Sequence, residues 1–331
     1  MIRFADLKED SAQTRLEPPS ASSQDPAKEK GANFVAAHWY RRACQFVNHA
    51  CHQVSNGATL GVSEGERLIA EIVHAQLKEK LPDELVIQSL YQEQSDSFLV
   101  NHMVNVSVYA IMVGGTLGLP QQQLSELGLS ALFHDIGKIL VPQEILYKKT
   151  SLSQQELAVL LQYPHESYNI LNRLGAEYHH LADTAFQVHE RFDGSGYPQG
   201  LKGKEIRPYA QIIGLVDIYE AITHDRPHRQ KFSHFLGMKE LIQSHKRAFH
   251  RDLFKALLQT FSLFPLNSYV KLNSGAIGKV VQTYGDQLLR PKVEIVVDAQ
   301  KRLVLAPRTI DLKEQAILHV VDAVAEEELP G

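Results

Sequence analysis

The sequence predicts a mainly α protein with a small antiparallel β extension near its C-terminal end. Two observations support this prediction. Apolar residues recur with helical periodicity from about residue 33 to residue 261, and β-branched runs separated by turn residues follow Pro265. The chain of 331 residues is 44% hydrophobic and 22% charged, which suits one sizeable domain with one or two small modules. This composition excludes a collagenous, coiled-coil or wholly disordered chain.

Two modules precede the main domain. We expect residues 1–31 to form a flexible segment, because residues 8–31 are polar and rich in Pro, Ser and charge. Residues 32–84 then form a helical module with a break at Asn56–Gly57 and an end at Leu81-Pro82-Asp83. Nothing in the sequence indicates the role of this module.

The main domain, residues 85–262, is expected to consist of one helix after another. Ser151 or Ser153 is a candidate N-cap, and Glu156 stands three residues after Ser153, as in a capping box. A glycine-rich loop interrupts the helices at Asp193–Gly203.

The C-terminal extension comprises residues 263–331. Its hairpin signals predict a small antiparallel sheet over Pro265–Pro307. We expect a short terminal helix near Leu312–Ala325 to follow this sheet.

Composition also limits the class of partner. The formal net charge of −4 does not favour a dedicated nucleic-acid binder. Residues 1–10 lack the apolar core of a signal peptide. The longest apolar run, Met103–Leu119, contains Asn105 and Ser107, so we expect a buried helix rather than a membrane span. These observations predict a cytoplasmic protein with no membrane span.

The two cysteines, Cys44 and Cys51, lie seven residues apart in a stretch with helical periodicity. This spacing separates them by about two helical turns. That distance is too long for a disulfide within one straight helix, so we expect two buried free thiols. Free thiols fit a reducing cytoplasm.

The first chemical motif is His134-Asp135-Ile136-Gly137-Lys138. The histidine offers a nitrogen ligand, and the carboxylate offers oxygens that can bridge two cations. Gly137 permits a sharp turn, and Lys138 can neutralise a phosphate. The alternative is a capping His-Asp pair at a helix end, and we take the second such pair, His224-Asp225, as structural.

The second motif runs from His189 to Pro198 and is followed by Gly200-Leu201-Lys202-Gly203. Its glycines and proline fix an irregular loop, which holds His189 at the end of the preceding helix. The alternatives are a turn-rich surface connection and an ordinary histidine at a helix C-terminus.

Two single residues add to these motifs. Asp217 stands in an apolar segment, where a carboxylate is costly unless it is hydrogen-bonded or bound to a metal. His102 stands on an apolar helix, 32 residues before His134. Taken alone, each residue is better explained as a hydrogen-bonded core residue.

Taken together and in this order, these residues resemble the HD-GYP domain, which belongs to the HD metal-dependent phosphohydrolases. The resemblance covers about Gln94–Gln230 and includes Asp225-Arg226-Pro227. The stretch after Pro265 resembles the β-rich extension often found after such domains. Members of this family hydrolyse the bacterial second messenger cyclic di-GMP to pGpG or GMP.

The resemblance implies a ligand set for two divalent metal ions. The implied ligands, with Asp135 bridging the ions, are His102, His134, Asp135, His189 and Asp217. Imidazoles and carboxylates suit Fe or Mn best, with Zn, Ni and Co left open.

The resemblance also implies substrate contacts. Lys138 would lie near the phosphate, and Arg226 would help to hold the substrate. Gly196-Tyr197-Pro198 is the signature loop, expected at or near the mouth of the site. Tyr197 would contact the substrate there, and the same loop is a candidate surface for a signalling partner.

Three positions depart from the family pattern. Phe98 stands four residues before His102, where members with three metals carry Glu, so a third metal is not expected. Tyr163 and Val188 stand where the family often has His, so we expect the second ion to be weakly held.

Other histidines lie near these positions. His165 follows Tyr163 by two residues, about 200° of helical rotation, and should therefore face elsewhere. Whether Tyr163 or His165 completes the second metal shell stays open. His179-His180 lies too far upstream to replace the missing histidine, and we expect a solvated helix end there.

The resemblance therefore predicts a metal-dependent phosphodiesterase of a bacterial signalling system, with Asp135 and Lys138 as catalytic residues. Two cations about 3.5–4 Å apart would bind the phosphate oxygens and lower the pKa of a bridging water. The alternative is a degenerate relative that binds metal, nucleotide or a signalling partner with little turnover. A third hypothesis is an HD hydrolase acting on another phosphoester.

Overall fold

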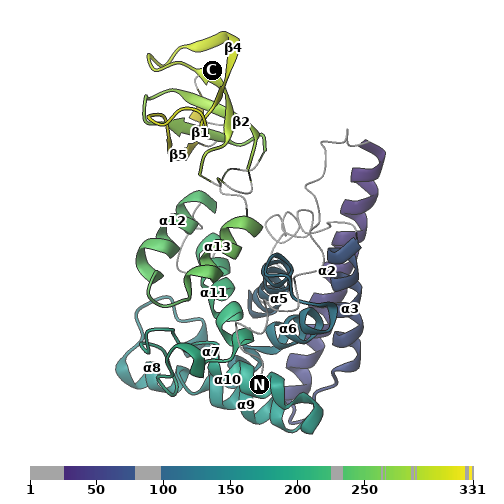
Figure 1. Cartoon of the computed structure of the whole chain (residues 1–331). Helices are drawn as coiled ribbons and strands as arrows, with labels where there is room; N and C mark the ends of the chain where they lie inside the picture. Colours follow the sequence, from purple (N-terminus) through teal and green to yellow (C-terminus); the bar gives the residue numbers. More distant parts are fainter. Residues whose placement is uncertain are drawn as a thin grey trace. The chain divides into compact units, whose positions relative to one another are not determined.

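The structure of the protein is a computed structural model. It describes residues 26–78, 98–224, 234–261, 266–284 and 289–324, together with positions 264, 287, 328 and 329. The chain divides into two compact units (Figure 1), which comprise residues 1–230 with 247–253, and residues 231–246 with 254–331.

The described part of the first unit begins with two long helices, α2 (Pro26–Ser55) and α3 (Ser63–Lys78), which pack against each other. The break predicted at Asn56–Gly57 is confirmed, because the chain turns there and Gly57 adopts a φ of 69°. The expected flexible segment is wrong from residue 26 onward, since α2 begins there. Proline fits the first turn of a helix, where its missing N–H has no intrahelical partner. Residues 1–25 lie outside the described residues.

The core of the first unit surrounds α5 (Phe98–Thr116), which contacts α2, α3, α6 (Gln121–Phe133) and α11 (Pro208–Thr223). Among the described helices, only α5 is long and apolar enough to cross a membrane, and 83% of the relevant window is buried inside the protein. The prediction of a buried helix is therefore confirmed.

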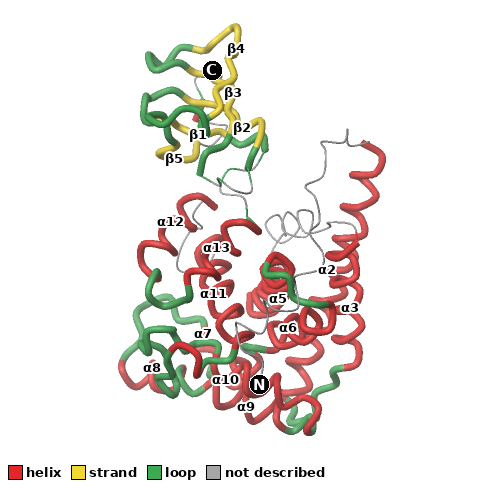
Figure 2. Tube along the Cα trace, viewed as in Figure 1, coloured by secondary structure: helices red, strands yellow, loops and turns green. Residues whose placement is uncertain are grey.

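Shorter elements complete this unit (Figure 2). They are η1 (Ile136–Leu140), α7 (Gln143–Leu146), α8 (Gln154–Leu160), α9 (Tyr163–Asn172), η2 (Ala176–Tyr178), α10 (His179–Gln187) and η3 (Gly203–Glu205). The capping box at α8 is confirmed: Ser153 Oγ accepts a hydrogen bond from the Glu156 amide at 3.2 Å, and the Glu156 carboxylate accepts one from the Ser153 amide at 2.7 Å.

The second unit contains α12 (His234–His245), the greater part of α13 (Arg251–Thr260) and an antiparallel sheet. The sheet has the strand order β4-β3-β2-β1-β5 among the described residues. Its strands are β1 (Tyr269–Leu272), β2 (Ile277–Gln282), β3 (Lys292–Val297), β4 (Leu303–Asp311) and β5 (Val320–Val324). In β3, buried and half-buried residues alternate, as expected for a strand with one face on a core.

The predicted terminal helix over Leu312–Ala325 is wrong. Residues 320–324 form β5, which pairs with β1 so that Tyr269 lies opposite Val324. Three β-branched valines in this stretch favour an extended backbone, and pairing with β1 supplies backbone hydrogen bonds that a lone terminal helix would not offer.

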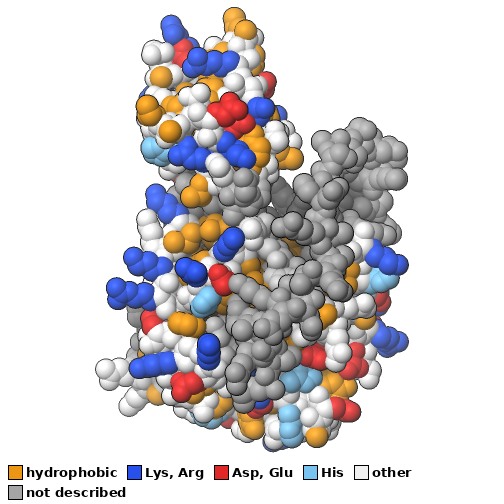
Figure 3. All heavy atoms as spheres, in the orientation of Figure 1, with side chains coloured by type: hydrophobic (Ala, Val, Ile, Leu, Met, Phe, Trp, Pro, Cys, Tyr) orange, Lys and Arg blue, Asp and Glu red, His pale blue; other side chains and the backbone are white. Residues whose placement is uncertain are grey.

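Both cysteines are free thiols, as predicted. Cys51 is buried and Cys44 is half-buried. Burial raises the pKa of Cys44 to about 12 and that of Cys51 to about 11. On the face of the molecule in Figure 3, side chains of both charge signs are interspersed among the described atoms.

Candidate metal centre

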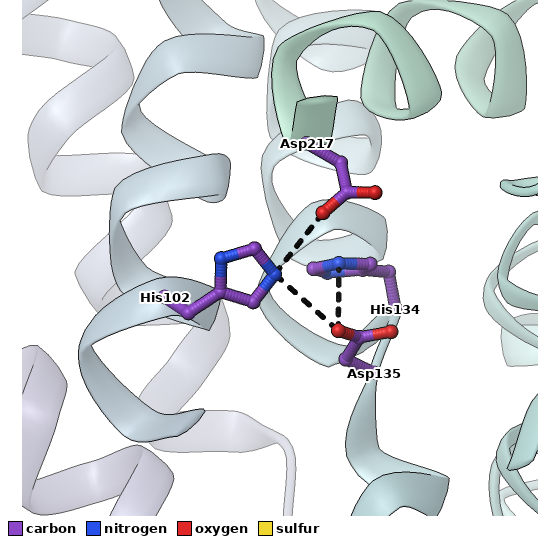
Figure 4. A group of neighbouring side chains, drawn as sticks. All are labelled: His102, His134, Asp135 and Asp217. Carbon is purple, nitrogen blue, oxygen red and sulfur yellow. Dashed lines mark ion pairs between the residues drawn. The ribbon is translucent and has the colours of Figure 1, made fainter. Parts of the chain in front are cut away.

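Four predicted ligands meet at one point inside the first unit (Figure 4). His102 comes from α5, His134 and Asp135 follow the end of α6, and Asp217 comes from α11. One ligand atom from each of the four residues lies within 4.8 Å of the others. Positions more than a hundred residues apart in the sequence thus form a single cluster.

The turn after α6 is held in place by Gly137. A β-carbon at this position would lie 2.3 Å from the Tyr163 carbonyl oxygen and 2.5 Å from the Ser167 amide nitrogen. The Gly137 amide instead donates a hydrogen bond to Ser167 Oγ at 2.9 Å. Because only glycine fits, η1 packs directly on α9, and this contact brings Tyr163 beside the cluster.

The distances within the cluster suit ligands that share a cation. His102 Nε2 lies 3.1 Å from Asp217 Oδ1 and 3.3 Å from Asp135 Oδ2. His134 Nε2 lies 3.4 Å from the same Asp135 oxygen. His134 Nδ1 donates to the Ala131 carbonyl oxygen at 2.7 Å, which leaves the Nε2 lone pair facing the cluster.

Three buried atoms of the cluster lack a hydrogen-bond partner among the described residues. These atoms are His102 Nε2, His134 Nε2 and Asp135 Oδ1. A buried polar atom left unpaired costs about 1–3 kcal/mol, and a coordinated divalent cation would remove that cost. Two imidazole nitrogens with two carboxylates form a donor set that binds Fe, Mn or Zn. The residues therefore fit a divalent metal ion.

The pKa values in the cluster reflect its concentrated charge. Burial alone would raise the pKa of Asp135, but the neighbouring His134, Lys138 and His102 side chains outweigh burial and hold it well below its usual range. The pKa of Asp217 is also lowered, since His102 and His189 outweigh its burial. Both carboxylates are therefore ionised at neutral pH and available as ligands.

Lys138 extends from η1 toward the Asp135 carboxylate. Its Nζ donates a hydrogen bond to Asp135 Oδ2 and lies 4.7 Å from the centre of the Tyr163 ring. The Lys138 side chain is 20% exposed, whereas the Asp135 side chain is fully buried. The ammonium group thus stands between the buried cluster and the cavity beside it.

His189 follows α10 and lies at the edge of the cluster rather than within the four-residue group. Its Nε2 is 3.8 Å from Asp135 Oδ1, and its Nδ1 is 3.9 Å from Asp217 Oδ2. The Tyr163 hydroxyl forms a hydrogen bond with His189 Nε2, and the Tyr197 ring stacks on the imidazole with a centroid distance of 5.2 Å. Burial lowers the pKa of His189, which favours its neutral form.

The loop after His189 folds back on its own start. The Glu190 carboxylate accepts hydrogen bonds from the amides of Gln199 at 2.6 Å and Leu201 at 2.9 Å. A β-carbon at Gly196 would lie 2.4 Å from the His189 carbonyl oxygen. These contacts hold the expected signature loop, which contains a cis Tyr197–Pro198 bond, against the metal cluster.

A cavity of about 510 Å³ opens beside the cluster. The metal cluster contributes His102 and Asp217 to its wall, and Tyr147 and Lys148 line it from the segment around α7. Its lining also includes the side chains of Lys138, Tyr163, His189 and Tyr197. The cavity therefore gives a ligand direct access to the cluster.

The departures from the family pattern have clear structural positions. The Phe98 ring stacks on His102 with centroids 6.0 Å apart and offers no ligand atom. Val188 is fully buried. His165 is exposed and packs edge-on against Phe186 at 4.8 Å, so it faces away from the cluster, as predicted.

The remaining predicted positions lie outside the cluster. His179 is exposed at the start of α10, as expected for a solvated helix end, but His180 is half-buried with its Nε2 shielded from solvent, so the expectation is wrong for His180. His224 Nδ1 hydrogen-bonds the Glu220 carbonyl oxygen at 3.0 Å, which fits the structural role expected for His224. Arg226 and Asp225 lie outside the described residues.

One buried acid beside the centre was missed by sequence reasoning. Glu220 Oε2 lies 2.6 Å from His102 Nδ1, and Glu220 Oε1 accepts a hydrogen bond from Asn105 Nδ2 at 3.0 Å. A signal was present, because Glu220 follows Asp217 by three residues on an apolar helix and so shares its face.

Comparison with known proteins identifies the class. The family model of the HD domain matches residues 47–253 of the sequence. The family model of a KOW domain associated with the HD domain matches residues 269–331. Because the first match covers more than half of the chain, the protein belongs to the HD domain family.

Individual relatives narrow this assignment. The chain is 30% identical over 218 residues to a cyclic di-GMP phosphodiesterase of Pseudomonas aeruginosa. This alignment covers 66% of this chain and 52% of that protein. It is 31% identical over 187 residues to a cyclic di-GMP phosphodiesterase of Borreliella burgdorferi. This second alignment covers 56% of this chain and 49% of that protein. The chain thus covers about half the length of these curated relatives.

A solved structure agrees with the fold. An HDG"Y"P protein of Bdellovibrio bacteriovorus superposes with a TM-score of 0.57 at 18% identity, over 70% of this chain and 73% of that one. The resemblance to the HD-GYP type is confirmed by these relatives and by the shared fold.

Proposed function

We propose that the protein is a metal-dependent phosphodiesterase that hydrolyses cyclic di-GMP to pGpG or GMP. The observation that carries this proposal is the four-residue cluster with unpaired buried donor atoms, which opens onto a cavity of about 510 Å³. The names of the two curated relatives support the choice of substrate.

The metal ions would be held by the residues already described. A first ion would be held by His102, His134, Asp135 and Asp217, and a second ion would be held by Asp135 with His189. We propose Fe or Mn as the natural ions, because imidazole and carboxylate donors suit them, with Zn, Ni and Co as alternatives. Bound divalent cations supply charge for an anionic phosphodiester and a nucleophile at neutral pH.

The side chains of this protein contribute three further functions. Asp135 is fully buried and ionised, so its carboxylate can hold and orient a bound ion. Asp217 is 13% exposed and lines the cavity, where its carboxylate can accept a hydrogen bond from an attacking water. The Lys138 ammonium faces the cavity and offsets charge on the phosphoryl oxygens.

The substrate contacts follow from the cavity lining. Tyr197 presents its phenol beside His189, where it can donate a hydrogen bond to a nucleotide. Arg226 is retained as a substrate contact on the resemblance alone.

Turnover of cyclic di-GMP by purified protein reconstituted with Fe²⁺ or Mn²⁺ tests this function. We expect pGpG or GMP as product, and loss of product in His134→Ala and Asp135→Ala. A panel of other cyclic dinucleotides and simple phosphoesters tests the alternative of a different substrate.

A second candidate function is favoured by the contact between Tyr163 and His189. The Tyr163 hydroxyl engages the His189 nitrogen that a second ion would use. If cyclic di-GMP binds to the protein but no product forms with any of these metals, the protein is a nucleotide-binding relative with little turnover.

We also propose a cytoplasmic location and a protein partner. The two free thiols support a reducing compartment. The loop Gly196-Tyr197-Pro198 is the proposed contact for a signalling partner, and Tyr197→Ala should weaken co-purification of that partner in the native host.

A further inference from the structure

We propose that Glu220 is a positioning residue for the metal centre, and that Tyr40 in α2 holds Glu220 in place through Asn105. This inference rests on the proposed metal centre but goes beyond it, because it assigns a role to the N-terminal helix.

A continuous chain of hydrogen bonds joins α2 to the cluster. The Tyr40 hydroxyl donates to Asn105 Oδ1 at 2.6 Å, and Asn105 Nδ2 donates to Glu220 Oε1 at 3.0 Å. Glu220 Oε2 lies 2.6 Å from His102 Nδ1. All four residues are at most 2% exposed.

The carboxylate of Glu220 fixes which nitrogen of His102 carries a proton. A carboxylate accepts but does not donate, so the close contact places the proton on Nδ1. The lone pair of a neutral His102 is then on Nε2, the atom that faces Asp135 and Asp217. Metal-binding histidines commonly depend on such a carboxylate for their orientation and basicity.

Asn105 in turn depends on Tyr40. With its amide nitrogen donating to Glu220, the oxygen of Asn105 must find a donor, and the Tyr40 hydroxyl supplies it. If the amide were reversed, its oxygen would face a carboxylate oxygen at hydrogen-bond distance, which is repulsive. Burial raises the pKa of Tyr40 well above its ordinary value, so the phenol stays protonated and remains a donor.

Another contact anchors Glu220 from its own helix. His224 Nδ1 lies 3.7 Å from Glu220 Oε1 and hydrogen-bonds the Glu220 carbonyl oxygen at 3.0 Å. The hydrogen bonds nevertheless run in one direction, since Tyr40 donates to Asn105 and Asn105 donates to Glu220. A change in the packing of α2 on α5 would therefore alter how firmly His102 is held.

Binding of Co²⁺ tests the proposal without requiring turnover. The affinity is measured by competition with a chromophoric chelator, and the visible spectrum of bound Co²⁺ reports its coordination. We expect Glu220→Gln to weaken Co²⁺ binding by about 10- to 100-fold and to change the spectrum. We expect Tyr40→Phe to weaken binding by at least about 3-fold, an effect that disappears when Glu220→Gln is already present.

The matched control is Tyr209→Phe. The Tyr209 hydroxyl donates to Glu126 Oε2 at 3.0 Å, in the same unit but outside the chain of contacts. This variant should bind Co²⁺ as the wild-type protein does. If Glu220→Gln fails to fold, as judged by circular dichroism, Tyr40→Phe compared with Tyr209→Phe carries the test.

The outcomes separate this inference from the proposed function. Unchanged Co²⁺ affinity and spectrum in Glu220→Gln overturn the inference, as does a loss in Tyr40→Phe that is equal with and without Glu220. Tight Co²⁺ binding by a wild-type protein that does not hydrolyse cyclic di-GMP refutes the function and leaves the inference standing. A wild-type protein that binds none of Co²⁺, Fe²⁺ and Mn²⁺ refutes both.

Discussion

The hydroxyl of Tyr163 forms a hydrogen bond with Nε2 of His189, at the edge of a metal cluster to which His189 would otherwise contribute that nitrogen. Tyr163 is only 4% exposed, and the pair lies in the wall of the cavity. The pair explains why a second ion should be held weakly, because the phenol competes for the donor atom. It also suggests how the metal content could be changed by one substitution.

Tyr163→His should raise the metal content toward two ions per chain. The new imidazole would replace the phenol with a nitrogen donor beside His189. Elemental analysis after desalting provides the measurement, with Tyr163→Phe as the control that removes the hydroxyl and adds no donor. The idea fails if the two variants and the wild-type protein retain equal amounts of metal.

His134→Ala should abolish most metal binding and lower kcat/KM for cyclic di-GMP by more than about 100-fold. It removes a ligand whose Nε2 has no hydrogen-bond partner among the described residues. The control is His165→Ala, since His165 is exposed and packs against Phe186 instead. Equal metal loss in both variants would mean that the cluster is not the binding site.

Lys138→Met should weaken cyclic di-GMP binding by about 10- to 100-fold, because a charge-assisted hydrogen bond contributes about 1.5–3 kcal/mol. Lys148→Met is the matched control. Lys148 lines the same cavity, but its Nζ lies 2.6 Å from both carboxylate oxygens of Glu156. Isothermal titration calorimetry with the nucleotide should give the larger loss for Lys138, and equal losses would argue against its role.

The thiols predict a specific response to pH. The folded pKa values of Cys44 and Cys51 are about 12 and about 11, above the value of about 8.5 for an unfolded thiol. Between these values the unfolded chain releases protons that the folded chain keeps, so stability is lost as pH rises from about 8.5 toward 11. Urea midpoints at pH 8 and pH 10 measure the loss.

Replacing both cysteines with alanine provides the control for this pH effect. The double variant should show a smaller decrease in urea midpoint between the two pH values. Thiol labelling at pH 8 should also be slow in the native protein and fast in denaturant. Rapid labelling of the folded protein would show that the thiols are not protected as described.

Much of the metal cluster could be predicted from the sequence because the ligands, taken in order along the chain, resemble those of a known family. His102 and Asp217 are polar residues on otherwise apolar helices, where a charge is costly without a partner. His134 and Asp135 stand at a helix end before a glycine. The contacts of His189 with Tyr163 and Tyr197 could not be predicted, since they depend on how two distant segments pack.

Glu220 and the C-terminal strand show two limits of sequence reasoning. Glu220 shares a helix face with Asp217, but its contact with His102 depends on the packing of α5 on α11, which the sequence does not show. Residues 320–324 were expected to be helical, but they form a strand because they pair with β1. In both cases the deciding contact joins segments that are distant along the chain.

Gly137 has a consequence for how this protein can vary. The turn that presents Lys138 touches the backbone of α9 through the space where a side chain would begin. Any other amino acid at this position would move the Lys138 ammonium group away from the Tyr163 phenol. The distance between the Lys138 ammonium group and the Tyr163 phenol therefore depends on the absence of a β-carbon at residue 137. A substitution at this residue would displace both side chains that line the cavity.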